Sequence, residues 1–337
     1  MYVCIVGATC EGLALAKTLP RSTYVVLDWD YRRIVRARSI GIEVEHVPPS
    51  LIPRLFASLG CDTVIVTEDF SELRKEILDY ISNHDIVAVF TTRFNSYEEH
   101  LASSREWRGT AVPDARICPG LSSILLGRAL AIHDTLERVE TIYRIAPISG
   151  FDSMVLEIVR NRQSVCIGID SGTVIQTPFL APVESVGRGR RVFSGSTPLT
   201  KYMTSRIKRF STVLESYPAA LVYATSFLGD VDHVDALMSR DVVELEVVVE
   251  GTISSRRRGL AYRVRYGRSD MSSICSLVAL TALSIAKAIA FQGIRGFVPP
   301  EVLGLDERLF CEVLSYLQLH GLDLEVCSLG EELYLGM

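Results

Sequence analysis

The first thirty residues constrain the fold more than any other stretch. An apolar run that begins at Met1 stops at Gly7, a helical pattern of apolar residues follows Gly12, and a second apolar run ends at Asp28. Strand, glycine turn, helix and strand in this order form a β-α-β unit of the kind that binds a dinucleotide. Gly7 allows the sharp turn, Gly12 allows the helix to pack closely, and the helix N-terminus presents N–H groups to a pyrophosphate.

The end of the second strand indicates which dinucleotide is expected. Asp28 lies 21 residues after Gly7, where a carboxylate accepts hydrogen bonds from a ribose diol and repels a 2′-phosphate. The sequence therefore predicts NAD, with NADP as the alternative if Arg32 or Arg33 pairs with the phosphate. Thr9 replaces the usual middle glycine, so its Cβ displaces the phosphate, although its hydroxyl can donate to a phosphate oxygen. A turn without a ligand is the competing interpretation.

The alternation of strands and helices continues beyond this unit. Strands are expected over 42–47, 63–66 and 85–92, with helices over 51–59 and 71–81. This order predicts an α/β fold with a doubly wound parallel sheet of the Rossmann type, whose ligand lies outside the carboxyl ends of the strands. The expected cofactor contacts are Gly7, Ala8, Thr9, Cys10, Glu11, Gly12, Asp28, Trp29, Val47, Thr67, Thr91 and Thr92. Each residue at a later strand end is equally consistent with a simple cap.

A further helix start is expected after the last of these strands. Pro119 suits the first turn of a helix, and Gly120 with two serines leaves that N-terminus rich in donors. Pro119 and Gly120 are therefore candidate contacts for the nicotinamide or the substrate. Ordinary helix initiation explains them equally well.

The middle of the chain is rich in expected strands, over 154–159, 165–169, 173–176, 242–250 and 260–266. The last two alternate, so Val243 and Leu260 share a face with other apolar residues while Glu244 and Arg263 lie on the opposite face. This pattern predicts an antiparallel pair with cross-strand charge pairs and one buried side. Because that side needs a cover, we expect a dimer interface there. The basic segment 204–210 is expected to be helical.

From residue 271 the chain is expected to be helical again. The expected organisation is therefore a Rossmann domain over 1–135 and a second α+β domain with a largely antiparallel sheet over 136–270. The helices over 271–337 are expected to return to the first domain. Residues 274–286 are apolar, but Lys287 ends the run, so a buried helix is favoured over a membrane span. A net charge of −5 gives no reason to expect nucleic acid or a membrane as partner.

The cysteines and the first residues bear on location. The eight cysteines form no C-x-x-C pair and lie mostly in apolar runs, so buried free thiols in a reducing cytoplasm are expected. No basic and then apolar leader precedes the first strand, which also favours a cytoplasmic protein.

Three segments resemble the saccharopine dehydrogenase and lysine 6-dehydrogenase family: the Gly7–Gly12 unit with Asp28, the segment from Cys118 to Arg128, and the run from Asp241 to Gly296-Phe-Val-Pro-Pro-Glu301. The resemblance implies a dimeric enzyme that moves a hydride between NAD(P) and an amine-bearing carbon of an amino acid. The N-terminal half, with Val64-Ile-Val-Thr-Glu-Asp, also resembles NAD-binding regulatory domains of potassium transporters, of the RCK or TrkA type. A non-catalytic NAD sensor is therefore the alternative.

Hydride transfer at such a carbon needs a clamp for the substrate carboxylate and a group that accepts a proton. Arginine matches carboxylate geometry, which makes Arg144, Arg206 and Arg209 the candidate clamps. The candidate proton acceptors are Asp114, His133 and Asp270, although His133 also suits a helix cap. The histidine spacing suggests no metal site.

Overall fold

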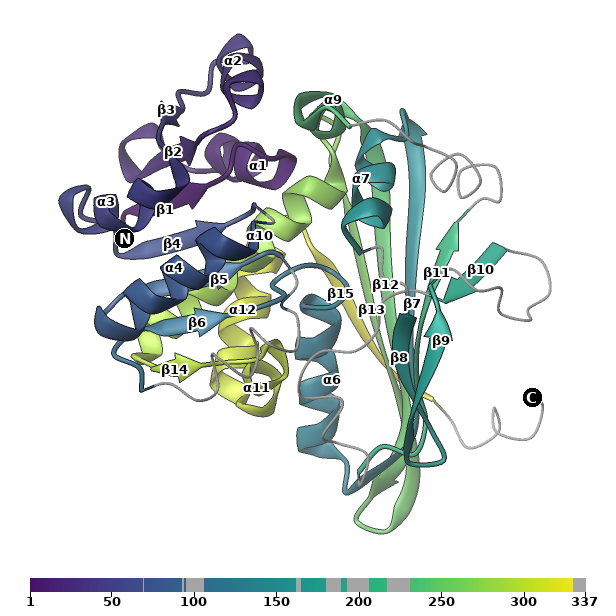
Figure 1. The fold of residues 1–337 in the computed structure, drawn as a ribbon. Helices are drawn as coiled ribbons and strands as arrows, with labels where there is room; N and C mark the ends of the chain where they lie inside the picture. Colours follow the sequence, from purple (N-terminus) through teal and green to yellow (C-terminus); the bar gives the residue numbers. More distant parts are fainter. Residues whose placement is uncertain are drawn as a thin grey trace.

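The computed structural model describes residues 1–68, 70–92, 94, 106–161, 165–179, 189–192, 206–216 and 231–329. Two sheets stand side by side with helices between them and on the outer face of the first sheet (Figure 1). The expected α/β architecture, with a Rossmann sheet and a second, largely antiparallel sheet, is confirmed.

The first sheet is parallel throughout, and its described strands follow the order β14-β6-β5-β4-β1-β2-β3. The strands are β1 (Val3–Val6), β2 (Tyr24–Asp28), β3 (Glu45–His46), β4 (Thr63–Val66), β5 (Val87–Phe90), β6 (Thr110–Val112) and β14 (Gly296–Phe297). Its helical connections are α1 (Cys10–Thr18), the short η1 (Arg21–Thr23), α2 (Tyr31–Ser39), η2 (Pro49–Leu51), α3 (Ile52–Ser58) and α4 (Ser71–Asn83). The expected strands at 63–66 and 85–92 and both expected helices are therefore present, whereas the third strand is only two residues long.

The second sheet contains the longest strands. Its described order is β15-β13-β12-β7-β11-β8-β9, with β10 paired to β11. The strands are β7 (Thr135–Ser149), β8 (Val165–Asp170), β9 (Thr173–Pro178), β10 (Gly189–Val192), β11 (Phe210–Ser216), β12 (Arg240–Ile253), β13 (Arg256–Gly267) and β15 (Asp323–Leu329). The cross-strand register pairs Glu244 with Arg265 and Glu246 with Arg263, as the alternation predicted.

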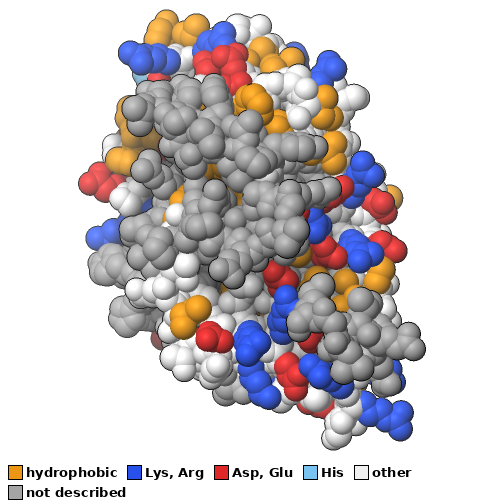
Figure 2. All heavy atoms as spheres, turned by 90° about the vertical axis from the view of Figure 1, so that its right-hand side faces the viewer, with side chains coloured by type: hydrophobic (Ala, Val, Ile, Leu, Met, Phe, Trp, Pro, Cys, Tyr) orange, Lys and Arg blue, Asp and Glu red, His pale blue; other side chains and the backbone are white. Residues whose placement is uncertain are grey.

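The apolar face of the second sheet is covered by helices of the same chain. Val243, Leu245, Val247 and Val249 are buried in one core with α6 (Leu121–Ile132) and α10 (Ser273–Gln292). The reason given for a dimer interface, an apolar face in need of a cover, is therefore wrong. The opposite face carries ion pairs, and Figure 2 shows basic and acidic side chains intermingled on this side of the molecule.

Two expected elements have a different structure. The segment 154–159, expected as a strand, lies within helix α7 (Asp152–Asn161), in which every residue from Ser153 to Ile158 is buried; a continuous apolar run fits a buried helix as well as a strand. In the segment expected as a basic helix, residues 204 and 205 lie outside the described residues and Arg206 to Arg209 form a turn before β11.

The last part of the chain serves both sheets. Helix α10 lies along the first sheet beside α1, and α11 (Pro300–Leu305) packs against α6. Helix α12 (Glu307–Leu319) packs on α10, and the chain ends its described part as β15 of the second sheet. Helix α10 is long and apolar enough to cross a membrane, yet 83% of its apolar window is buried, which confirms the expected buried helix. A short helix α9 (His233–Met238) packs on α1 and α7.

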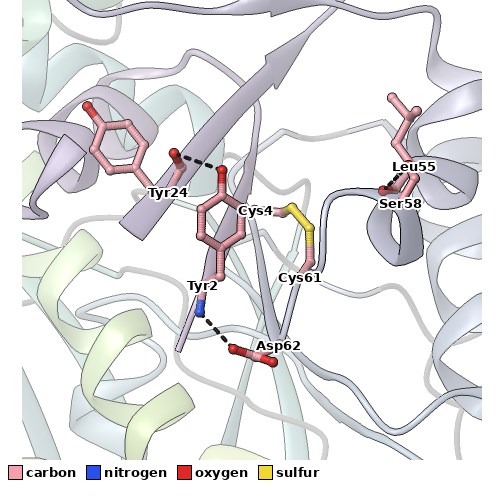
Figure 3. Close-up of a disulfide and its surroundings, with 7 residues drawn as sticks. All are labelled: Tyr2, Cys4, Tyr24, Leu55, Ser58, Cys61 and Asp62. Atoms are coloured by element: carbon pink, nitrogen blue, oxygen red, sulfur yellow. Dashed lines mark hydrogen bonds between the residues drawn. A yellow bond between two sulfur atoms is a disulfide. The ribbon is translucent and has the colours of Figure 1, made fainter. Parts of the chain in front are cut away.

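Cys4 and Cys61 form a disulfide, which corrects the expectation that the cysteines are free thiols (Figure 3). Cys4 lies in β1 and Cys61 precedes β4, so neighbouring strands bring two cysteines 57 residues apart into contact. Nearby, the backbone N–H of Tyr2 donates to Asp62 (2.8 Å), which fixes the same two segments. Cys275 is a buried free thiol, as expected.

Candidate functional site

The strand order reverses direction at the centre of the first sheet. From β1 the chain continues to β2 and β3 on one side, and from β4 it continues to β5 and β6 on the other. The connections that follow β1 and β4 therefore leave toward opposite edges of the sheet. This is the position at which parallel α/β sheets bind nucleotides. The loop Gly7–Thr9 and residues Thr67 and Glu68 meet there.

Both expected glycines are required by close approaches. Gly7 has φ +108°, and a Cβ on it would lie 2.9 Å from the Thr67 hydroxyl. A Cβ on Gly12 would overlap the Gly7 carbonyl oxygen. Larger residues at either position would therefore force β1 away from α1 or from the loop after β4.

Thr9 takes the structural role of a helix cap. Its hydroxyl accepts from the Gly12 N–H (3.3 Å) at the start of α1 and donates to the Thr67 hydroxyl (2.8 Å). Thr67 in turn donates to the Gly7 carbonyl (3.0 Å). The expected donation from Thr9 to a phosphate oxygen would have to replace the bond to Thr67. Ala8, Cys10 and Glu11 complete this buried turn.

Asp28 is fully buried and tied to the glycine loop. One carboxylate oxygen accepts from the Ala8 N–H (2.6 Å), and the other accepts from the Asp30 N–H (2.7 Å). Arg33 lies 3.3 Å from the second oxygen. The carboxylate therefore sits at the end of β2 beside the loop after β1, as expected, but an arginine already neutralises it.

Arg33 extends from α2 across this edge to the loop after β4. Its guanidinium forms a close ion pair with Glu68 and lies 3.6 Å from Asp30. It also lies over the ring of Trp29, 5.5 Å from its centroid, and Trp29 contacts Phe70. This cluster of Asp28, Trp29, Arg33 and Glu68, hereafter the β2 cluster, occupies the place expected for the adenosine ribose. Arg33 was expected only as a partner of a 2′-phosphate and Glu68 only as a strand-end residue; their pairing was not expected, because one comes from α2 and the other from the segment after β4.

The remaining strand-end candidates are buried. Val47 donates its N–H to the Asp28 carbonyl (2.9 Å), so it is a backbone support. Thr91 donates its N–H to the Val66 carbonyl (2.9 Å), and the carbonyl of Thr92 accepts from Asp114 (3.3 Å). Within the described residues the buried hydroxyl oxygen of Thr92 has no hydrogen-bond partner. Thr92 is therefore the candidate among them with an unused polar atom.

The segment from Asp114 to Gly120 folds into a tight buried turn before α6. Asp114 has φ +53°, Cys118–Pro119 is a cis peptide, and Gly120 has φ +119°. A Cβ on Gly120 would overlap the Arg116 backbone. Gly120 is the N-cap of α6, which begins at Leu121, so the expectation that Pro119 lies in the first turn of this helix is wrong: Pro119 precedes the cap.

Arg116 joins the two sheets at this turn. Its guanidinium forms a close ion pair with Glu157 of α7 and lies 4.0 Å from Glu11 of α1, and all three side chains are buried. Burial, with the nearby Glu157 carboxylate, raises the pKa of Tyr143 on β7 well above its usual range, so this phenol keeps its proton. Arg116, Tyr143 and Glu157 were missed by the sequence analysis, since each stands alone in an apolar stretch.

The candidate clamps lie away from this edge. Arg144 is on the outer face of the second sheet, paired with Glu215 (2.8 Å) and Glu246 (3.1 Å). Arg206 donates to the carbonyls of Leu130 and His133 (2.7 Å each), where it caps the C-terminal end of α6. Arg209 is exposed beside Asp170.

Two of the candidate proton acceptors are also elsewhere. His133 ends α6 next to Arg206, at the end opposite Gly120, and its Nδ1 lies 2.9 Å from the Ala129 carbonyl oxygen. Asp270 pairs with Arg268 at the surface (2.7 Å), and that bond lowers the pKa of Asp270. Asp114 alone remains buried at the sheet edge. The described residues contain no group of side chains suited to a metal ion.

No protein-family model matches the sequence, and no curated protein matches it. Among solved structures, the chain is similar to apo saccharopine dehydrogenase (L-Glu forming) from Saccharomyces cerevisiae, with a TM-score of 0.68 and 10% identity over 98% of this chain and 100% of that chain. C. glutamicum DAP dehydrogenase in complex with DAP is more distant, with a TM-score of 0.44 and 10% identity over 91% of this chain and 96% of that chain. The first similarity shows that the chain shares its fold with this saccharopine dehydrogenase.

Proposed function

We propose that this protein is an NAD(P)-dependent oxidoreductase that transfers a hydride at an amine-bearing carbon of an amino acid, such as lysine or a saccharopine-like compound. The observation that carries the proposal is the arrangement of Gly7, Gly12 and Asp28 at the reversal point of the first sheet. The shared fold with saccharopine dehydrogenase supports it.

The residues at the glycine loop fit a dinucleotide in part. A Cβ on Gly7 would meet Thr67 and Glu68, and one on Gly12 of α1 would overlap the Gly7 carbonyl, so the turn after β1 packs closely on both neighbours, and the first turn of α1 supplies N–H groups for a pyrophosphate. At the ribose end, Arg33 must turn away from Asp28 or share it with the diol. When bound, a nicotinamide nucleotide would supply the hydride acceptor or donor.

The substrate side of the proposal relies on the turn before α6. Arg116 and Tyr143 are the cationic and neutral donors at this junction, and Asp114 is the buried carboxylate nearby in the chain. These residues replace Arg144, Arg206 and Arg209 as candidates for orienting an amino acid. Their burial keeps water away from the reacting atoms.

The test is a calorimetric titration with NAD and NADP, followed by incubation of the nucleotide-bound protein with single amino acids. We expect one nucleotide to bind, and at least one amino acid to change the absorbance of the nicotinamide ring. No binding of either nucleotide would reject the proposal.

The second candidate is a non-catalytic NAD-binding sensor. The ion pair between Arg33 of α2 and Glu68 after β4 favours it, because this contact couples two separate segments at the expected nucleotide site. Tight nucleotide binding with no redox change for any amino acid, in both directions, would favour the sensor over the enzyme.

We also propose that the protein is a homodimer, as the family resemblance implies. The second sheet supports this proposal through its ion-paired outer face, which self-association could cover. Sedimentation that gives a monomer across micromolar concentrations would reject it.

A further inference from the structure

The end of β2 carries both of the signals that distinguish NAD from NADP. A carboxylate at this position selects the ribose diol, and an arginine nearby accommodates a 2′-phosphate. Asp28 and Arg33 satisfy both rules at once, and they lie 3.3 Å apart. These two residue types alone therefore do not decide between NAD and NADP. The preference depends on which other groups bind the Arg33 guanidinium.

We propose that Glu68 decides the choice in favour of NAD, because its carboxylate occupies the place at Arg33 that a 2′-phosphate would take. Glu68 comes from the loop after β4 and forms the closest ion pair of Arg33. The inference rests on the proposed function, since it assumes that a nicotinamide dinucleotide binds at this edge.

The geometry holds Glu68 in position. An added Cβ on Gly7 would lie 3.1 Å from the Glu68 Cβ and 3.2 Å from its N–H nitrogen, so the backbone of Glu68 packs directly on the glycine turn. From there its carboxylate reaches Arg33 of α2. Arg33 is only 15% exposed and lies over Trp29, which restricts where the guanidinium can turn.

The net charge around Arg33 also favours NAD over NADP. Arg33 lies within ion-pair distance of three carboxylates, those of Asp28, Asp30 and Glu68. Three carboxylates and one guanidinium have an excess of negative charge, which repels a phosphate but not a diol. Without the charge of Glu68, Arg33 would keep Asp28 and could offer its remaining N–H groups to a phosphate in two parallel bonds.

The experiment compares nucleotide affinities by calorimetry for the unaltered protein and three variants. Glu68→Gln keeps the size of the side chain and removes its charge. Glu72→Gln is the matched control, since it removes a carboxylate from the exposed first turn of α4, four residues further along. Glu68→Gln with Arg33→Met tests whether any gain requires the guanidinium. Thermal unfolding of each variant checks that the fold is retained.

We expect the unaltered protein to prefer NAD, and Glu68→Gln to reduce that preference about tenfold or more by tightening NADP. Glu72→Gln should leave the ratio unchanged, and the double variant should lose the gain for NADP. An equal effect of Glu68→Gln and Glu72→Gln, or a gain that survives Arg33→Met, would overturn the inference while leaving the proposed function intact. Failure of the unaltered protein to bind either nucleotide would reject both.

Discussion

At the scale of single residues, the most consequential contact is the buried ion pair of Arg116 and Glu157. Charges removed from water are costly unless each is paired, and the carboxylate of Glu11 lies near the same guanidinium. One arginine therefore compensates two buried carboxylates from α1 and α7. Loss of that arginine would remove this positive charge from beside both carboxylates at the junction of the two sheets.

We predict that Arg116→Met lowers the free energy of unfolding by about 3–5 kcal/mol, because two buried carboxylates lose their counter-charge. Arg295→Met is the control, since Arg295 is 61% exposed and pairs with the exposed Asp85. It should cost at most about 1 kcal/mol. Urea denaturation measures both values, and equal losses would contradict a special role for Arg116.

Residues whose role is local could be predicted from the sequence. Gly7, Gly12 and Asp28 lie within one β-α-β unit, so their spacing alone places them together. Arg144 and Arg206 could not be placed, because their partners, Glu246 and the carbonyl of Leu130, come from distant segments. The pair of Glu68 and Arg33 belongs to the same class, since nothing in the sequence shows that α2 meets the segment after β4.

At the scale of elements, α6 and α11 are held at very short range by glycine. An added Cβ on Gly127 of α6 would overlap the Glu301 carbonyl, and one on Gly304 of α11 would overlap the Ile124 carbonyl. The two helices therefore touch backbone to backbone. This contact ties α6, which begins at Leu121, to the C-terminal segment of the chain.

We predict that Gly127→Ala destabilises the protein by about 1–3 kcal/mol or more, since the helices must separate to admit a methyl group. Gly267→Ala is the matched control, because its Cβ would meet only a Val242 methyl group at 3.6 Å. Thermal unfolding should show a clear decrease for the first variant and little change for the second. A tolerated Gly127→Ala would mean that α11 can shift without cost.

Elements with a clear period were predicted well, and those with mixed signals were not. The alternation over 242–250 and 260–266 marks the centres of β12 and β13. The apolar run at 154–159 fits a strand by composition, but a helix buried on all sides, as α7 is over 153–158, produces the same run. Strand β7 was missed because charged residues interrupt its apolar pattern. These residues form ion pairs on the outer face of the assembled sheet, and the sequence alone does not show those pairs.

At the scale of the whole molecule, both sheets share one hydrophobic core. The core that contains Val3 and Leu13 of the first sheet layer continues to Val247 and Tyr266 of the second. Asp241 of β12 lies within it and accepts from Ser153 of α7 (2.6 Å) and from Ser272 and Ile274 at the start of α10. This carboxylate therefore connects the second sheet to the helix that returns to the first.

Burial raises the pKa of Asp241, although the serine hydroxyl groups and backbone N–H groups oppose the shift. Between its unfolded and folded pKa values the native state binds the extra proton, so the contribution of Asp241 to stability falls as pH rises through that window. We predict that Asp241→Asn gains stability relative to the unaltered protein from about pH 4 upward. Urea denaturation at several pH values measures the difference. A relative stability that falls with rising pH would contradict the prediction.

The connections between the sheets also set how the molecule can move. The chain enters the second sheet at Thr135, where β7 begins, and leaves it at Gly267, whose partner Val242 pairs with Ala146 near the other end of β7. These two anchors lie about 35 Å apart along the strands. The chain enters the second sheet again at Asp323, which pairs with Arg265 close to Gly267, so its crossings lie at two places on the sheet. The chain itself therefore ties the second sheet to the rest of the molecule near both ends of its longest strands, so parting the two layers at either end would pull on a covalent connection.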